Sequence, residues 1–372
     1  MDWPSLLVGA VIGVGAGIVG QNMLFPVAER RWRERRLRAY YRKANAIWAK
    51  FEQLHPRLVL MQSGWDGDGC FSPGSIVMRL GRDFHLTGIA SNFRSEHADK
   101  WKADGFTNGT PIGIAGISII RTSDDPSAEL RGRAHKLELS VHRYHYFDFL
   151  ATHMLRLVGS EGERSALDAL VGDGPGQPVP GFPTPCSVGL SVFCEDGAYI
   201  LLTRRAVKSG AGGYWEAGKI FNCVAENAAP RDFAAANREA HESTPDVIAR
   251  RGLYEEMGFR EEDIQAARLR LHSFAWASDV LDFKFFGIFE TSLSRSESQE
   301  KWRNAVDRLE TLGVELDAWP VASALDCKKL LIAIRDNSED WSPEAAFCTV
   351  RSLMTLRKIS VEDLSIVVGS RS

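Results

Sequence analysis

Arg251-Gly-Leu-Tyr-Glu-Glu-Met-Gly-Phe259 is the stretch that decides the fold of the C-terminal half of the chain. We predict that it closes a helix beginning at Thr244 or Pro245, because threonine is a favoured N-cap residue and proline suits the first helical position. Gly258 is placed to end this helix, since glycine readily adopts the left-handed conformation that follows a last turn. The sequence therefore predicts a helix whose last turn carries two adjacent glutamates.

Apolar segments of strand length lie on both sides of the predicted helix. A hairpin signal, Glu195-Asp-Gly-Ala198, separates the first two of them. The predicted elements are strands at 188–194, 199–203 and 281–289 and a closing helix at 343–357. Strands mixed with a few helices in this order predict an α+β fold built as an α/β/α sandwich, which we place at residues 187–372.

Length and composition restrict the class of protein. The chain has 372 residues, of which 44% are hydrophobic and 25% are charged. These values are ordinary for folded domains and exclude a mainly disordered, a collagenous or a multi-span membrane protein. The net charge of −3 provides no excess of basic residues, so no DNA or RNA polymer is expected as a partner. The six cysteines lie far apart, so we interpret them as buried, reduced side chains.

The stretch 251–259 resembles the second half of the Nudix box, Gly-x5-Glu-x7-Arg-Glu-U-x-Glu-Glu-x-Gly-U, in which U is apolar. The matching residues are Arg251, Leu253, Glu255, Glu256, Gly258 and Phe259. Leu201-Leu-Thr-Arg-Arg205 and Gly213-Tyr-Trp215 resemble the strand and the loop that precede a Nudix helix. The resemblance covers roughly residues 186–330 and implies a Nudix-like sandwich.

The chain departs from the full box at three positions. Gly252 stands where the helix has the first of its three metal-binding glutamates, Ser243 stands where the box has its earlier glutamate, with Glu242 one residue out of register, and Asn237 stands where it has its first glycine. Carboxylates at i, i+3 and i+4 share a helix face and together hold divalent metals against a diphosphate. Only Glu255 and Glu256 remain here, and such a pair binds Mg²⁺ weakly through retained waters. We therefore expect binding and not efficient hydrolysis, with no catalytic residue assigned and no required cofactor.

Each of these residues also has an ordinary interpretation. Glu255 and Glu256 would form an exposed acidic helix end in which Glu255 pairs with Arg251. A glycine inside a helix costs about 1 kcal/mol relative to alanine, so Gly252 has another purpose, either room for a ligand or room for a packed side chain.

Basic and aromatic residues near the predicted hairpin and on the helix are candidates for contact with a nucleotide. Guanidinium and ammonium groups suit phosphates, and an aromatic ring stacks a base with about 1–3 kcal/mol. The candidate ligand-binding residues are Arg204, Arg205, Lys208, Trp215 and Arg251. The alternatives are a solvated strand edge for the two arginines of the hairpin and core packing for the tryptophan.

The N-terminal segment differs from the rest, since no charged residue occurs between Asp2 and Glu29. Residues 4–24 would span about 31 Å as a helix, enough to cross the hydrocarbon core of a bilayer. A cleaved signal peptide would need a positive n-region that is missing, and a buried soluble helix of this length and uniformity is uncommon. We predict a transmembrane helix. Small residues every four positions on one face predict close packing between two such helices, and they are Gly9, Gly13 and Gly17.

The region after this segment is strongly basic, with six arginines between Arg30 and Arg38. The positive-inside rule then places the N-terminus outside and the large C-terminal part in the cytoplasm. We expect a basic juxtamembrane helix at 27–60, a β-rich region at 63–159, and a linker rich in proline and glycine at 160–186.

A single membrane span joined to a degenerate Nudix domain resembles the transmembrane Nudix effectors of bacterial cyclic-oligonucleotide anti-phage signalling systems, as does the run Tyr146-Phe-Asp-Phe-Leu-Ala-Thr152. In that family the Nudix-like domain senses a cyclic nucleotide made on infection, and the membrane part damages the cell inner membrane in abortive infection. The resemblance implies a cyclic oligonucleotide, the lipid bilayer and a second copy of the chain as partners. The alternatives are a membrane-tethered Nudix hydrolase of nucleoside diphosphate derivatives and a membrane scaffold without a ligand.

Overall fold

The computed structural model describes residues 58–64, 69–123, 128, 135–158, 161–162, 177–179, 181–205, 218–236, 242–277, 281–307 and 316–368. All of them belong to one compact unit, which extends from Trp48 to Ser372. The predicted transmembrane helix, its three glycines and most of the predicted juxtamembrane helix lie outside the described residues. Within the described part of the chain, no helix has the length and apolar character needed to cross a membrane.

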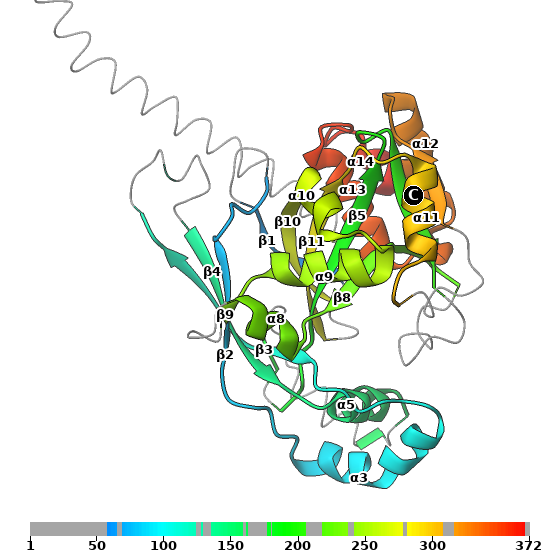
Figure 1. Cartoon of the computed structure of the whole chain (residues 1–372). Helices are drawn as coiled ribbons and strands as arrows, with labels where there is room; N and C mark the ends of the chain where they lie inside the picture. Colours follow the sequence, from blue (N-terminus) through cyan, green and yellow to red (C-terminus); the bar gives the residue numbers. More distant parts are fainter. Residues whose placement is uncertain are drawn as a thin grey trace, which may run out of the picture. The chain divides into compact units, whose positions relative to one another are not determined.

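An eight-stranded mixed sheet forms the larger core (Figure 1). Its main path runs through β1 (Leu58–Ser63), β10 (Arg268–Ala277), β11 (Asp282–Glu290), β5 (Cys186–Cys194), β6 (Tyr199–Arg204) and β12 (Asp317–Pro320), with β7 (Ile220–Asn222) paired to β6 and β8 (Val224–Asn227) paired to β5. β11 and β5 run parallel, and the other pairs are antiparallel. The predicted hairpin and the predicted strand at 281–289 are confirmed.

Helices cover both faces of this sheet, because successive side chains of a strand point to opposite faces. Val188 and Leu190 of β5 share a hydrophobic core with Leu253 of α9 (Pro245–Met257). On the other face α13 (Pro343–Thr355) packs, and the rings of Phe286 and Phe347 lie 5.0 Å apart. The α+β class and the closing helix are confirmed.

A four-stranded sheet lies beside the larger one, with the order β3 (Ile112–Arg121), β4 (His135–Arg143), β2 (Ile76–Leu80) and β9 (Glu242–Ser243). β2 and β4 run parallel, so this sheet is also mixed. Two backbone hydrogen bonds connect it to segments of the sandwich, from Ile112 N–H to Ala228 O at 2.9 Å and from Ile114 N–H to Thr184 O at 2.7 Å. The residues just before β5, expected to belong to a linker, therefore hold the two sheets together.

Two expectations need correction. The region at 63–159 contains α3 (Gly88–Ala103) and α5 (Tyr146–Val158) as well as strands. Phe93, His97 and Trp101 recur every four residues, and their rings follow one another along α3, which is a helical pattern. Residues 58–60, expected to end the juxtamembrane helix, lie in β1, because they pair in antiparallel register with 275–277 of β10.

The remaining elements complete the layers around the sandwich. They are α8 (Pro230–Ala236), α10 (Glu261–Ala266), α11 (Arg295–Arg303), α12 (Ala324–Asp336), a 3-10 helix at Ser338–Asp340 and α14 (Leu364–Val368). All six cysteines are buried and free of disulfides, as predicted.

Candidate functional site

The helix α9 carries most of the candidate site, and the local signals in its sequence set both of its ends. Pro245 is its first residue, although the side chain of Thr244 makes no capping hydrogen bond. Gly258 adopts the left-handed conformation with φ of 68°, and the N–H groups of Gly258 and Phe259 bond to carbonyls of the last turn. The predicted limits of the helix are confirmed.

Gly252 faces β8 at a point where no side chain fits. A Cβ atom on this residue would lie 2.7 Å from Cγ1 of Val224 and 2.9 Å from Cβ of Glu226. Both of these atoms are close to the strand backbone, so neither can move away easily. Of the two purposes considered for this glycine, the close packing of a neighbouring side chain is the one that the structure bears out. A glutamate at this position would require α9 and β8 to separate.

Arg251 stands at the centre of a network of carboxylates. Its Nη1 atom lies 2.8 Å from Glu226 and 2.9 Å from Glu255, while its Nε and Nη2 atoms lie 2.7 and 3.1 Å from Asp232. Arg231 contacts Glu255 as well, at 2.8 Å. The pairing of Arg251 with Glu255 is confirmed, and it is one part of a larger arrangement that joins α8, β8 and α9.

Burial and charge act in opposite directions on the titration of these groups. Burial alone lowers the pKa of Arg251, but the hydrogen bonds that Arg251 donates to Asp232 and the charge of Glu226 outweigh it and hold that pKa above its ordinary value. Burial raises the pKa of Glu226, and Arg251 offsets only part of this effect. Arg251 is therefore a permanent positive charge at this position.

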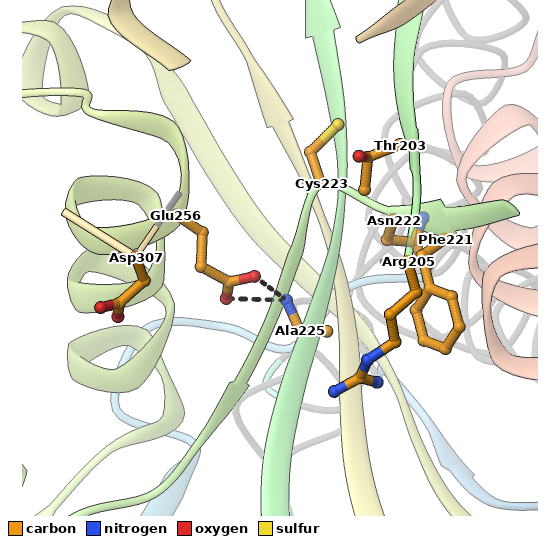
Figure 2. A pocket seen from close by; sticks show the side chains of 8 residues that line it. All are labelled: Thr203, Arg205, Phe221, Asn222, Cys223, Ala225, Glu256 and Asp307. Atoms are coloured by element: carbon orange, nitrogen blue, oxygen red, sulfur yellow. Dashed lines mark hydrogen bonds between the residues drawn. The ribbon is translucent and has the colours of Figure 1, made fainter. Parts of the chain in front are cut away.

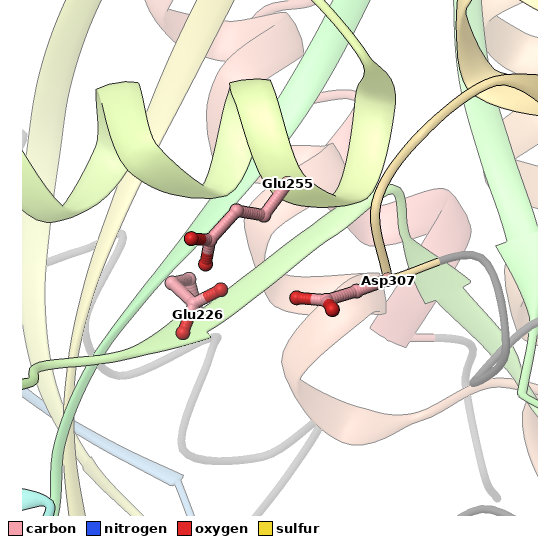
Figure 3. A group of neighbouring side chains, drawn as sticks. All are labelled: Glu226, Glu255 and Asp307. Atoms are coloured by element: carbon pink, nitrogen blue, oxygen red, sulfur yellow. The ribbon is translucent and has the colours of Figure 1, made fainter.

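Three carboxylates converge in one place: Glu226 from β8, Glu255 from α9 and Asp307 from the loop after α11 (Figure 3). One oxygen of each lies within 4.8 Å of the others. The Asp307 N–H donates to the carbonyl of Glu255 at 2.9 Å, which holds the loop against the helix end. Carboxylate oxygens are ligands that hard divalent cations prefer, so the donor set fits Mg²⁺. A cation at this position would compete with Arg251 for Glu226 and Glu255.

Glu256 turns away from this group. Its two carboxylate oxygens lie 3.0 and 3.3 Å from the N–H of Ala225, which donates to them and ties the last turn of α9 to β8 (Figure 2). Glu255 is only 8% exposed, so these residues do not form an exposed acidic helix end. The group of potential metal ligands contains Glu255 with Glu226 and Asp307, and Glu256 is not part of it.

A pocket opens beside the last turn of α9, between this helix and strands β6, β7 and β8 (Figure 2). The space within it and its open mouth amounts to about 480 Å³. Its lining includes Thr203, Arg205, Phe221, Ala225, Glu256 and Asp307. The Arg205 guanidinium lies over the ring of Phe221, 5.1 Å from its centre. The pocket therefore presents one guanidinium, two carboxylates and an aromatic ring within a small space.

The structure separates the predicted ligand-binding residues. Arg205 lines the pocket, whereas Arg204 donates to the carbonyl of Gly218 at 3.1 Å and is not part of the lining. Arg251 lies in the carboxylate network. Lys208 and Trp215 lie outside the described residues.

Sequence reasoning missed Glu226, Asp232, Asp307 and Thr203. For Thr203 a signal existed, because it stands two residues before Arg205 and positions i and i+2 of a strand share one face. For the acids, no local pattern shows which strand or loop meets α9.

Comparison of the sequence with protein-family models and with curated proteins gives no match to either.

Proposed function

We propose that this chain is a nucleotide sensor with a Nudix-like site that binds its ligand without hydrolysing it. The observation that carries this proposal is the position of Arg251 among Glu226, Asp232 and Glu255. In a metal-dependent hydrolase, divalent cations held by carboxylates neutralise the diphosphate and generate the nucleophile. Here a side chain of the protein itself supplies the positive charge that those carboxylates need.

The packing of Gly252 supports the same conclusion. Because a Cβ at this position would lie 2.7 Å from Val224, the face of α9 that meets β8 carries no third carboxylate of its own. The helix therefore packs closely on the strand, and Arg251 and Arg231 offset part of the negative charge of the carboxylates. A site whose groups already contact one another suits recognition, since little ordering is required when the ligand binds.

The ligand class follows from the pocket and from the resemblance of the chain. Arg205 offers a planar guanidinium, which pairs well with phosphate oxygens. Phe221 is 5% exposed and lies beneath this guanidinium, so its ring supports Arg205. A guanidinium held in this way suits the phosphates of a cyclic oligonucleotide.

The complete proposal places this sensor in antiviral defence. The N-terminal segment would anchor the chain as a single span in the cell inner membrane, with the sensor in the cytoplasm. Binding of the nucleotide would bring sensor units together and raise the effective concentration of the attached spans. The associated spans would then damage the membrane and abort the infection.

A membrane-tethered hydrolase of nucleoside diphosphate derivatives is the second candidate. The convergence of Glu226, Glu255 and Asp307 within 4.8 Å favours it, because this group could hold Mg²⁺ if Arg251 moved aside. The two candidates differ in what they do to a bound nucleotide.

The test uses the full chain in lipid nanodiscs. Calorimetric titration with cyclic di-guanylate, cyclic di-adenylate and cyclic di-uridylate, with Mg²⁺ and with EDTA, measures binding. Chromatography of the same mixtures, and of mixtures with ADP-ribose, measures turnover. We expect binding of a cyclic nucleotide that survives EDTA and leaves the nucleotide intact. Multiple turnover that requires Mg²⁺ and is lost in Glu255→Gln, but kept in the exposed control Glu262→Gln, would establish the hydrolase instead.

A further inference from the structure

β3 is the edge strand of the four-stranded sheet, and only part of its outer edge is covered. Near the start of the strand, Ile112 N–H and Ile114 N–H donate to carbonyls of segments of the sandwich. A β-bulge between Ile114 and Gly116 ends this arrangement. From residue 116 to residue 120, no backbone hydrogen bond joins β3 to any described segment other than β4. This stretch therefore presents, at alternate residues, N–H and C=O groups with which another strand can pair.

The apolar core face of this sheet continues to the uncovered edge. Residues that lie opposite each other on neighbouring strands share one face of a sheet. Ile76 on β2, Leu137 on β4 and Ile119 on β3 form one such row. The first two are 4% and 0% exposed, whereas Ile119 is 52% exposed. The apolar row is therefore interrupted at β3, where a large side chain remains in contact with water.

This stretch of β3 lacks the features that usually protect an edge strand, which include lysine, proline and short length. β9, at the opposite edge of the same sheet, has only two residues. β12, at an edge of the larger sheet, ends in Pro320. β3 has ten residues, and its segment Gly116-Ile-Ser-Ile-Ile120 contains neither a charge nor a proline. Such an edge is suited to pairing with another strand.

We propose that β3 pairs in antiparallel register with β3 of a second copy of this chain, with a two-fold axis at Ser118. The uncovered stretch 116–120 is centred on this residue, so its whole length is paired in that register. Ile119 then lies opposite Ile117 of the partner subunit. The apolar row that ends at Ile119 thereby continues into the core face of the second copy.

The edge is self-complementary, and for this reason a second copy is the occupant. In a two-fold interface, if residue i of one copy meets residue j of the other, then j also meets i. On the core face, both pairs around Ser118 join isoleucine to isoleucine. On the other face, Ser118 meets its own counterpart and Gly116 meets Ile120. Arg121 is the first charged residue and lies beyond the paired stretch, so the paired stretch places no like charges opposite each other.

The pairing surface is small. A stable interface uses about 20–30 residues from each partner, whereas the uncovered stretch extends only from residue 116 to residue 120. Strand pairing alone is therefore weak, and it becomes appreciable when other contacts or a bound nucleotide bring two copies together. The inference rests on the proposed function for the part that the nucleotide plays, whereas the pairing surface itself does not depend on it.

Disulfide trapping on the full chain in detergent solution tests the pairing. All six native cysteines are buried, so a thiol added at an exposed position reacts separately from them. Ser118→Cys is nearly isosteric, and residues directly opposite each other on antiparallel strands have Cα atoms about 4.5–5.5 Å apart, within the reach of a disulfide. With copper phenanthroline and no nucleotide, Ser118→Cys should form a covalent dimer at least about tenfold faster than Ser95→Cys, because pairing raises the effective concentration of the thiols. Ser95 is an exposed serine of α3 and is the matched control.

Two further comparisons test the register and the surface. Ile120→Cys should be trapped as slowly as Ser95→Cys, because residue 120 lies opposite residue 116 and not opposite its own counterpart. Adding Ile119→Lys to Ser118→Cys should also reduce trapping to that rate, since a lysine on an edge strand opposes pairing. Adding Ile89→Lys, at an exposed isoleucine of α3, should leave the fast rate unchanged.

The possible results separate this inference from the proposed function. Equal rates for Ser118→Cys and Ser95→Cys, as expected if another segment of the chain covers the edge, would overturn the pairing. If light scattering then showed association driven by cyclic di-guanylate, cyclic di-adenylate or cyclic di-uridylate, the proposed function would stand without it. Fast trapping in Ile120→Cys would overturn the register. Fast trapping in Ser118→Cys alone that none of the three nucleotides accelerates would support the pairing and overturn the nucleotide-driven association in the proposed function.

Discussion

Arg251 and Glu255 lie one turn apart on α9, and Nη1 of the arginine is 2.9 Å from Oε2 of the glutamate. An isolated pair of this kind adds only about 0.3–0.5 kcal/mol to a surface helix. This pair is different, because the side chains are only 11% and 10% exposed and the same guanidinium serves Glu226 and Asp232. The arginine is therefore the shared partner of three acids that have little access to water.

Replacing Arg251 should lower the free energy of unfolding. Arg251→Met keeps the length of the side chain but leaves the three carboxylates without their shared partner, so we expect a loss of about 3–5 kcal/mol in the free energy of unfolding. Urea denaturation followed by tryptophan fluorescence measures it. Arg250→Met is the control, because Arg250 is 42% exposed and its ion pair with Glu261, at 3.4 Å, is exposed to solvent. Equal, small losses in both variants would contradict a shared compensating role for Arg251.

Gly252 provides a second test of the contact between α9 and β8. In an ordinary helix interior, Gly→Ala stabilises by up to about 1 kcal/mol. Here the added methyl group meets Val224 at 2.7 Å, so Gly252→Ala should instead destabilise the chain by about 1–3 kcal/mol. Combining it with Val224→Ala should recover part of the loss, and a double-mutant cycle in urea measures the coupling. Additive losses would show that the methyl group does not meet Val224.

The sequence predicted what depends on near neighbours along the chain. The limits of α9 follow from Pro245 and Gly258, which act through the backbone of their own turns. The strands β5 and β6 follow from the hairpin signal between them. The pairing of Arg251 with Glu255 follows from helical spacing alone.

What the sequence did not predict depends on the register of distant segments. Glu226 lies near Glu255 because β8 packs against α9. Asp307 lies near Glu255 because the loop after α11 is hydrogen-bonded to the C-terminal end of α9. Local helix propensity did not show whether Gly252 makes room for a ligand or for a packed side chain. The contact with β8 shows that it makes room for a packed side chain. The helix α3 was missed for another reason, since its aromatic residues recur every four positions within a polar stretch whose helical period is weak.

The pH dependence of stability should reflect Asp282 at the start of β11. Burial raises the pKa of this carboxyl to about 6, and the negative charge of Glu344 acts in the same direction, although Lys284 lies 3.5 Å away and Ser187 donates to the carboxyl. A carboxyl whose pKa is raised on folding stabilises the fold most below its unfolded value near 3.8, and the benefit is lost as the pH rises through about 6.

Asp282→Asn removes that titration and keeps an oxygen for Ser187. Relative to this variant, the parent chain should lose about 3 kcal/mol of stability between pH 4 and pH 7, since one pKa unit is worth about 1.4 kcal/mol. Urea denaturation at several pH values measures the difference. Asp340→Asn, at an exposed 3-10 helix, should leave the pH profile unchanged. A constant difference between the parent chain and Asp282→Asn would show that the carboxyl titrates normally.

Arg204 and Arg205 are neighbours in sequence with different surroundings, and they form a matched pair for ligand binding. Arg205 lines the pocket, whereas Arg204 is bound to the carbonyl of Gly218 and is not part of the lining. Arg205→Ala should therefore lower the affinity for cyclic di-guanylate by about 1.5–3 kcal/mol, the range for a hydrogen bond to a charged group. Arg204→Ala should change it little. Calorimetric titration distinguishes them, and equal losses would remove this pocket as the place where phosphate is bound.

The last prediction connects ligand binding to the predicted membrane span. If the nucleotide acts by bringing sensor units together, the spans must pack closely, and the glycine stripe at residues 9, 13 and 17 is the surface expected to permit this. Gly13→Ile should then reduce killing of cells that make the cyclic nucleotide, without changing membrane insertion or nucleotide affinity. Gly15→Ile, the same substitution off the stripe, should kill as the parent chain does. If Gly13→Ile cells die as fast as parent cells at equal protein level, the signal reaches the bilayer by a route other than close glycine packing.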